Sequence, residues 1–186
     1  MATGTRSRTR LAIIDAAIGA LARNQGASLG EIATAAGVGR STLHRYFPER
    51  SDLLAAVSAV GLSRVEEARA RARLADGTGA SAMRRLCQEY FDLGDLLTLI
   101  FSDPQLTSDP SWNESIGCDD ELAGVVERGH RDGTIDPQLP PNWVQSLLWS
   151  MLYAGWAQSN EPGVSKHDIL PLLIRSFEGA VGAKQA

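Results

Sequence analysis

The chain has 186 residues, of which 44% are hydrophobic and 22% charged, proportions that exclude a disordered or fibrous protein. Its two cysteines are too few for a small secreted scaffold held together by disulfides. The formal net charge is −4, but residues 1–52 hold seven arginines against four acidic residues, whereas the rest of the chain is acidic. A basic head on an acidic body suggests that the head meets a polyanion.

The first part of the chain predicts four helices. Apolar residues recur at helical spacing before a stop at Gly26, namely Leu11, Ile14, Ile18 and Leu21. Ser28 and Glu31 have the S-x-x-E spacing of a capping box, which predicts a second helix over about 29–36. Gly37, Val38 and Gly39 interrupt it, and a third short helix over about 40–47 ends before Pro48. A fourth helix carries Leu53, Leu54 and Val57 and runs to about residue 72.

Helical patterns continue after a loop at 76–79, which is the best candidate boundary in the chain. The predicted helices are 81–93, 94–101, 119–131, 142–158 and 165–181. The segment 103–117 is turn-rich and predicts a loop with a short turn of helix, and 133–141 predicts a second loop. No strand-like alternation is present, so we expect an all-α protein of about nine helices.

No segment of the sequence predicts membrane insertion. The N-terminal arginines are not followed by an apolar signal segment. The uncharged run 137–160 contains prolines, serines and amides, so it predicts a buried helix and not a membrane span. We therefore expect a soluble, cytoplasmic protein.

The second and third helices form a helix-turn-helix pattern. Gly37 allows the tight backbone of the turn, and Val38 inserts the turn into the core. Leu43 should point inward and leave a polar outer face from Arg40 to Tyr46, whose donors suit phosphates and base edges. The alternative is an ordinary corner between two helices with a solvated polar face.

The wider segment from Ile32 to Leu54, I-A-T-A-A-G-V-G-R-S-T-L-H-R-Y-F-P-E-R-S-D-L-L, resembles the tetracycline-repressor-like (TetR) family of transcriptional regulators. The matching features are Ile32-Ala33, Ala36-Gly37-Val38, Thr42-Leu43, Tyr46-Phe47, Arg50 and Leu53-Leu54, with Ile14, Ala17, Leu21 and Gly26 upstream. The resemblance covers about residues 9–58. The later helices match the family in number, length and loop placement.

This resemblance implies a three-helix DNA-binding head over residues 1–52 and a helical regulatory and dimerisation domain over 53–186. In the head, Arg40 and Ser41 take the positions that usually read base edges, and Arg40 could bond to guanine through two hydrogen bonds. The family pattern assigns phosphate contacts to Thr42, His44, Tyr46 and Arg50. His44 departs from the usual Tyr, and Arg50 replaces the commoner Lys.

Three further features complete the expected DNA interface. Arg45 is at a variable position and could read a base or anchor a phosphate. Ser28, at the start of the second helix, is also expected to contact DNA. Arg6, Arg8 and Arg10 form either an arm on the DNA or a solvated tail.

The last two helices predict a homodimer. On the helix that begins near residue 142, one apolar face carries Val144, Leu148, Met151, Leu152 and Gly155, and the opposite face carries Trp149, Tyr153 and Trp156. A helix that is apolar on two faces must be buried twice. The final helix adds a stripe of Leu170, Leu173, Ile174, Phe177 and Val181, so we expect a four-helix interface from two chains. The alternative is one large core within a single chain.

Aromatic residues of the body suggest an effector site, because ligand sites combine an apolar lining with a few polar groups. The expected lining is Cys87, Tyr90, Phe91, Phe101, Trp112, Trp149, Tyr153 and Trp156. Nearby acidic residues favour a cationic or neutral ligand over an anionic one. The alternative for each of these residues is ordinary core packing.

Signals for other functions are weak. Residues 26–30 match G-x-S-x-G, but the nucleophile elbow of hydrolases requires a strand before the serine, and here a helix precedes it. The three histidines lie far apart, so we expect no metal site. We also expect no cofactor and no enzyme activity. The sequence predicts a ligand-responsive transcriptional regulator, most often a repressor in this family, that binds operator DNA. The alternative is a helical protein-interaction domain with a degenerate head.

Overall fold

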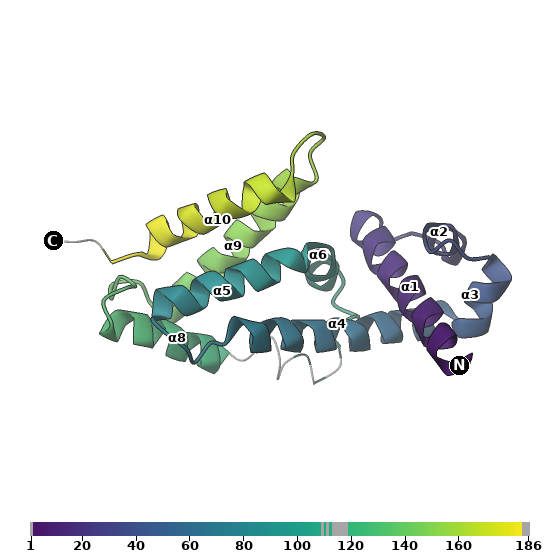
Figure 1. Ribbon diagram of the computed structural model, residues 1–186, viewed down its shortest axis with the longest axis horizontal. Helices are drawn as coiled ribbons and strands as arrows, with labels where there is room; N and C mark the ends of the chain where they lie inside the picture. Colours follow the sequence, from purple (N-terminus) through teal and green to yellow (C-terminus); the bar gives the residue numbers. More distant parts are fainter. Residues whose placement is uncertain (1, 109, 111, 113–118, 184–186) are drawn as a thin grey trace. The chain divides into compact units, whose positions relative to one another are not determined.

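The structure is a computed structural model that describes residues 2–108, 110, 112 and 119–183. Within these residues the chain forms nine helices and no strand, which confirms the predicted all-α class (Figure 1). The helices are α1 (Ala2–Arg23), α2 (Leu29–Ala35), α3 (Arg40–Tyr46), α4 (Arg50–Ala72), α5 (Gly79–Asp92), α6 (Gly94–Ser102), α8 (Asp119–Arg131), α9 (Pro141–Ser159) and α10 (Lys166–Val181). Apart from the start of α1, the predicted helices are confirmed to within a few residues at each end. In the part of the chain that the structure describes, no helix is long and apolar enough to cross a membrane.

The helices pack into two compact units. The first contains the described residues of 1–64 and 95–112, and the second those of 65–94 and 113–183. Helix α4 passes from the first unit to the second after Arg64. The expected assignment of DNA binding to 1–52 and of regulation to 53–186 concerns function and stays a prediction.

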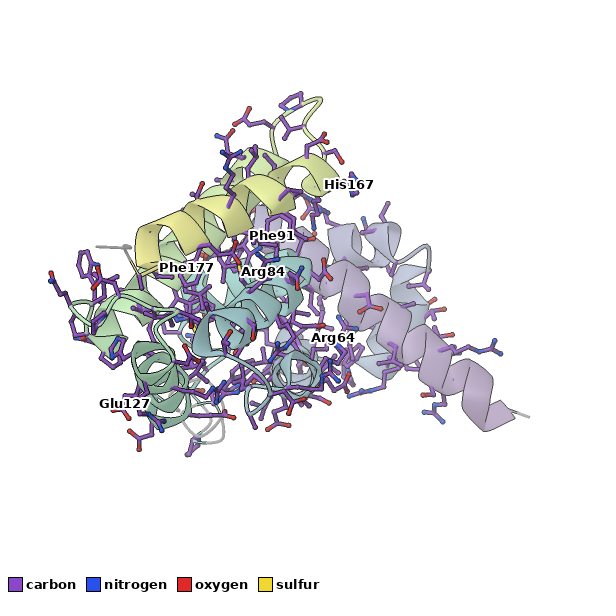
Figure 2. The ribbon with its side chains drawn as sticks, turned by 60° about the vertical axis from the view of Figure 1, so that its left-hand side comes forward. Arg64, Arg84, Phe91, Glu127, His167 and Phe177 are labelled. Atoms are coloured by element: carbon purple, nitrogen blue, oxygen red, sulfur yellow. The ribbon has the colours of Figure 1, made fainter. Side chains whose placement is uncertain are left out.

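The core of the first unit is built from one face of each of its first four helices. Its buried apolar side chains are Ile13, Ile14, Ala17, Ile18 and Leu21 from α1, Ile32 and Ala33 from α2, Leu43 and Phe47 at α3, and Leu53, Ala56 and Val57 from α4. Full burial of one large apolar side chain stabilises a fold by roughly 1.5–3 kcal/mol. An ion pair between Arg64, labelled in Figure 2, and Asp15 joins α4 to α1 at the surface.

Helix α1 begins earlier than the sequence suggested. It runs from Ala2, so Arg6, Arg8 and Arg10 lie on helical turns, and whether they contact DNA stays a prediction. The buried face of the same helix starts at Ile13, three residues after Arg10. The helical backbone therefore fixes these arginines relative to the core of the unit.

The second unit packs α5 against α8, α9 and α10, and α9 lies along α10 (Figure 1). At one crossing the backbones of α5 and α8 touch, because a Cβ atom on Gly79 would lie 2.4 Å from the Cα atom of Gly129. At another, the Cβ atom of any residue at Gly155 would lie 2.6 Å from the Cδ1 atom of Leu173. Arg84 of α5, labelled with Phe177 of α10 in Figure 2, pairs with Glu178. Glycine at these crossings lets the helices approach closely.

The two faces expected on α9 are only partly confirmed. Val144, Leu148, Leu152 and Gly155 are buried, as predicted for the first face. On the second face, however, Trp156 is also buried in the unit, while Tyr153 is 63% exposed. The stripe expected on α10 also packs within the chain, since Leu173, Phe177 and Val181 are buried. Trp156, Leu173, Phe177 and Val181 therefore belong to the core of the second unit, and the dimer stays a prediction.

Candidate DNA interface

Helix α2 begins with the capping box that the sequence predicted. The backbone amide of Ser28 donates to Oε2 of Glu31 over 2.7 Å, and the amide of Glu31 donates to Oγ of Ser28 over 3.2 Å. The carboxylate of Glu31 also accepts from the hydroxyl of Ser28 over 2.8 Å, and the bonds from the amide and the hydroxyl of Ser28 lower the pKa of Glu31 below its usual value. The capping box also satisfies amides that the first turn of a helix leaves without partners. Ser28 is thus the N-cap of α2, and its contact with DNA stays a prediction.

The turn between α2 and α3 depends on glycine at one position. Gly37 has a φ of +66°, a conformation that side-chain-bearing residues rarely adopt. The amide of Ala36 donates to the carbonyl of Ile32 over 2.9 Å, and that of Val38 donates to the carbonyl of Ala33 over 3.0 Å. These hydrogen bonds close the end of α2 and direct the chain into α3.

Helix α3 divides its side chains as the helix-turn-helix pattern predicted. Leu43 is buried, as is Phe47, which caps the end of the helix. Four side chains of the predicted DNA-binding set are exposed on the outer face, namely Arg40, Ser41, His44 and Arg45. Thr42 and Tyr46 are half-buried at the edges of that face. The polar side chains that the sequence assigned to DNA therefore share one side of a short helix.

Arginines from α1 and α3 gather around the end of α3. The Cζ atom of Arg6 lies 6.0 Å from the centre of the Tyr46 ring, and that of Arg45 lies 5.8 Å from the same ring. The Cζ atom of Arg10 lies 5.3 Å from the centre of the Phe47 ring. These distances are in the range of cation–π contacts. Among the described residues, no carboxylate forms an ion pair with these three arginines, so the end of α3 carries an excess of positive charge.

Arg40, the predicted base reader, lies against the backbone of α2. A Cβ atom on Gly30 would lie 3.2 Å from Nε and 3.4 Å from Cζ of Arg40. The absence of a side chain at Gly30 therefore leaves room for the guanidinium group. The sequence analysis did not identify this role of Gly30, because no local pattern connects it with Arg40.

Arg50 is bound to its own chain. Its Nη1 and Nη2 atoms donate to the carbonyl oxygens of Ala27 and Gln25 over 2.5 and 2.7 Å. The half-buried guanidinium thus ties the start of α4 to the connection between α1 and α2. An arginine has five N–H donors, so the phosphate contact predicted for Arg50 is compatible with these two bonds and stays a prediction. The forked guanidinium gives a reason for Arg at a position where Lys is commoner, since Lys cannot hold two carbonyls in this geometry.

The residues expected to line an effector site lie in three different places. Cys87, Tyr90, Phe91, Trp149 and Trp156 belong to the interior of the second unit, on α5 and α9. Tyr90 and Trp149 stack with ring centres 5.2 Å apart, and Nε1 of Trp156 donates to the carbonyl of Phe91 over 3.1 Å. Tyr153 is exposed on α9, whereas Phe101, which is exposed, and Trp112, which is buried, belong to the first unit. The structure therefore brings five of the eight together.

Burial also determines the chemistry of two of these interior residues. It raises the pKa of the Cys87 thiol to about 12, so the thiol stays protonated at neutral pH. It raises the pKa of the Tyr90 hydroxyl as well, although Arg69 lowers it in part. Both groups act as neutral packing residues and not as reactive ones.

This arrangement, an exposed polar helix set on a glycine turn and a compact helical core, defines a helix-turn-helix DNA-binding protein. Residues 13–57 match the family model described as bacterial regulatory proteins of the tetR family. The chain is 36% identical over 179 residues to the HTH-type transcriptional repressor LfrR of Mycolicibacterium smegmatis, which covers 96% of this chain and 93% of that protein.

Solved structures agree with this assignment. The crystal structure of the TetR-like regulator LfrR from Mycobacterium smegmatis in complex with proflavine matches with a TM-score of 0.72 and 33% identity, over 97% of this chain and 99% of that one. The ketosteroid regulator KstR2 of Mycobacterium tuberculosis, at 13% identity, has a TM-score of 0.76 over 94% of this chain and 95% of its own, and shows the fold alone. The chain belongs to the TetR family and is a DNA-binding transcriptional repressor, not an enzyme.

Proposed function

We propose that this repressor holds its operator as a homodimer through α3, and that a small-molecule effector releases it. The observation that carries the proposal is the outer face of α3, where Arg40 and Arg45 are exposed and form no ion pair with any described acidic residue. Arg40 reads a guanine, while Thr42, His44, Tyr46 and Arg50 contact phosphates. The site of action would be the cytoplasm, where bacterial DNA lies.

The dimer that we propose uses the exposed faces of α9 and α10. Trp143 is 58% exposed, Tyr153 63% and Leu172 60%, and large exposed apolar residues are common at interfaces between subunits. Between Trp143 and Tyr153, the exposed residues Ser146 and Ser150 are small enough for a close helix contact. In this proposal the two α3 helices of the dimer occupy successive major grooves, which lie roughly 34–36 Å apart along the DNA.

Proflavine, a planar aromatic cation, is the first effector to test, because the LfrR structure contains it. We propose the aromatic residues around Tyr90 and Trp149 as its stacking partners, which requires that these packed rings separate. Asp92 and Glu89, which pairs with Arg71, are the acidic residues on the same helix. To change the ratio of DNA-competent to incompetent protein from 1:99 to 99:1, an effector must prefer one state by roughly 10⁴-fold.

DNA binding is tested by selecting the preferred operator from a random pool and measuring the affinity of variants for it. We expect Arg40→Ala to change the selected sequence and to cost about 1–3 kcal/mol, which is the value of a bidentate contact with guanine. The matched control is Arg131→Ala, which removes one exposed positive charge from α8. An unchanged operator preference in Arg40→Ala would refute the base-reading role. If the wild-type protein selected no sequence, the alternative of an interaction domain with a degenerate head would be favoured.

Effector release is tested by titrating proflavine with and without the selected operator, using tryptophan fluorescence. Linkage requires that operator DNA weaken proflavine binding by the same factor by which proflavine weakens operator binding. Equal proflavine affinities in the two titrations would show that this ligand does not regulate DNA binding.

A further inference from the structure

Gly30, in the first turn of α2, lies against the side chain of Arg40, the first residue of α3. Side chains of a helix lean towards its N-terminus, which carries Arg40 back towards α2. A Cβ atom on Gly30 would lie 3.2 Å from Nε, 3.4 Å from Cζ and 3.4 Å from Nη2 of Arg40. The guanidinium group therefore occupies the space that a side chain at residue 30 would fill.

The backbone itself does not require glycine at residue 30. Gly37 needs its glycine for a φ of +66°, whereas Gly30 has ordinary helical backbone. Glycine inside a helix is less favourable than almost any other residue. At the nearby Gly39 a Cβ atom would meet only Oγ of Ser41, at an ordinary 3.9 Å. The contact with Arg40 therefore distinguishes Gly30 from the two glycines of the turn.

The charge of Arg40 stays available for DNA in this position. The neighbouring carboxylate of Glu31 accepts from the amide and the hydroxyl of Ser28, over 2.7 and 2.8 Å, within the capping box. Arg40 is exposed and forms no ion pair with an acidic residue in the described part of the chain. Contact with the bare backbone of Gly30 thus restricts the direction of the side chain without neutralising it.

We propose that Gly30 is a positioning residue for base reading by Arg40. Two parallel hydrogen bonds to a guanine require the guanidinium plane to meet the edge of the base in one orientation. The space above Gly30 sets that orientation, and a larger residue there would turn the same arginine away from its base. Sequence preference at this base pair then depends on α2 as well as on α3. The inference rests on the proposed function, because it requires that Arg40 reads a base.

The test is a double-mutant cycle on the operator that the wild-type full chain selects from a random pool. The preference at each base pair is measured for wild type, Gly30→Leu, Arg40→Ala and the double variant. We expect Gly30→Leu to lower the preference at the base pair read by Arg40 at least about fivefold, the lower end of what one bidentate contact is worth, and to leave the other base pairs unchanged. In the Arg40→Ala background, Gly30→Leu should have no further effect, because residue 30 acts through the arginine.

Two further variants control for size and for folding. Gly30→Ala requires the guanidinium to shift by only a few tenths of an ångström, so its effect at the same base pair should be smaller. Gly124→Leu makes the same replacement at an exposed position of α8, where a Cβ atom would meet no other described group within 4 Å, and should leave every preference unchanged. Both leucines replace glycine in a helix, so urea midpoints should not fall below that of wild type.

The outcomes separate this inference from the proposed function. An unchanged preference in Arg40→Ala would refute base reading by Arg40, and the inference with it. A changed preference in Arg40→Ala but not in Gly30→Leu would overturn the inference alone. An equal effect of Gly30→Leu in both backgrounds would also overturn it, because residue 30 would then act on DNA by itself. If Gly30→Leu were less stable than wild type, Gly30→Ala would decide, and an unchanged preference in that variant would count against the inference.

Discussion

Helix α3 presents its charged side chains outward, whereas helix α9 divides its aromatic side chains between the interior and the surface. Arg40 and Arg45 are exposed on α3, and only Leu43 of that helix is buried. On α9, Trp156 is buried and Tyr153 is exposed, although the two are three residues apart. A seven-residue helix can bury only one narrow face, so its pattern defines its outer surface. On a nineteen-residue helix that packs on several neighbours, the burial of each aromatic residue depends on which neighbour it faces.

The largest expected effect tests the division on α9. Trp156→Ala should lower the free energy of unfolding by about 3–5 kcal/mol, because it removes a buried indole and its hydrogen bond to Phe91. Tyr153→Ala, on the side proposed for the dimer contact, should change it by less than about 0.5 kcal/mol at concentrations where the protein is monomeric. Urea unfolding followed by circular dichroism measures both. Similar losses in the two variants would mean that the aromatic residues of α9 are not divided in this way.

The same comparison can be made on α3. Leu43→Ala should cost about 2–5 kcal/mol of stability, because it opens a cavity in the core of the first unit. Arg45→Ala should cost less than about 1 kcal/mol, since it loses only an exposed cation–π contact with Tyr46. Operator affinity should fall in Arg45→Ala at temperatures where the variant is fully folded. A stable Leu43→Ala protein with normal affinity would contradict the assignment of the two faces.

A smaller effect tests the two carbonyl contacts of Arg50. Arg50→Lys keeps the charge but loses the fork, so we expect a loss of about 1–3 kcal/mol in the free energy of unfolding without DNA. The control is Arg23→Lys, at an exposed position of α1. Thermal unfolding of the DNA-free proteins is the measurement. If Arg50→Lys were as stable as Arg23→Lys, the two carbonyl contacts would not stabilise the fold, and DNA contact would be the only role left for Arg50.

The smallest effect is the pH dependence of the capping box on α2. Hydrogen bonds from Ser28 lower the pKa of Glu31 below its usual value of 4.5. A lowered pKa in the folded state stabilises the fold at pH values above the unfolded pKa, and this stabilisation is lost as the pH falls through the folded pKa. The stability difference between wild type and Glu31→Gln should therefore be largest near neutral pH and shrink towards pH 3. A difference that stayed constant in urea midpoints over this range would refute the role of the carboxylate.

The elements that local rules specify could be predicted from the sequence. The capping box of Ser28 and Glu31, the turn at Gly37 and the end of α3 before Pro48 each depend on a few neighbouring residues. Contacts between distant residues could not be predicted in this way. Arg50 bonds to carbonyls 23 and 25 residues earlier, and no local pattern indicates those acceptors.

The effector candidates were the least predictable because aromatic residues serve equally well as core and as ligand lining. Tyr153 and Trp156 lie about 60° apart around α9, so they fall on either side of the boundary of its buried face. Phe101 and Trp112 belong to the first unit. The sequence could not indicate this, because residues 95–112 group with residues 1–64, which are distant in the chain. A pocket of about 580 Å³ between α4 and residues 105–112 was missed for the same reason, since its two walls are about fifty residues apart.

The backbone contact between α5 and α8 has a consequence for movement within the second unit. With no side chain between Gly79 and Gly129, the two helices cannot come closer, and separating them would open a gap along a buried seam. Hydrogen bonds from the amides of Gly79 and Ala80 to Asp132 and Thr134 secure the same point. The crossing is therefore a fixed joint, at which α5 and α8 move as one piece.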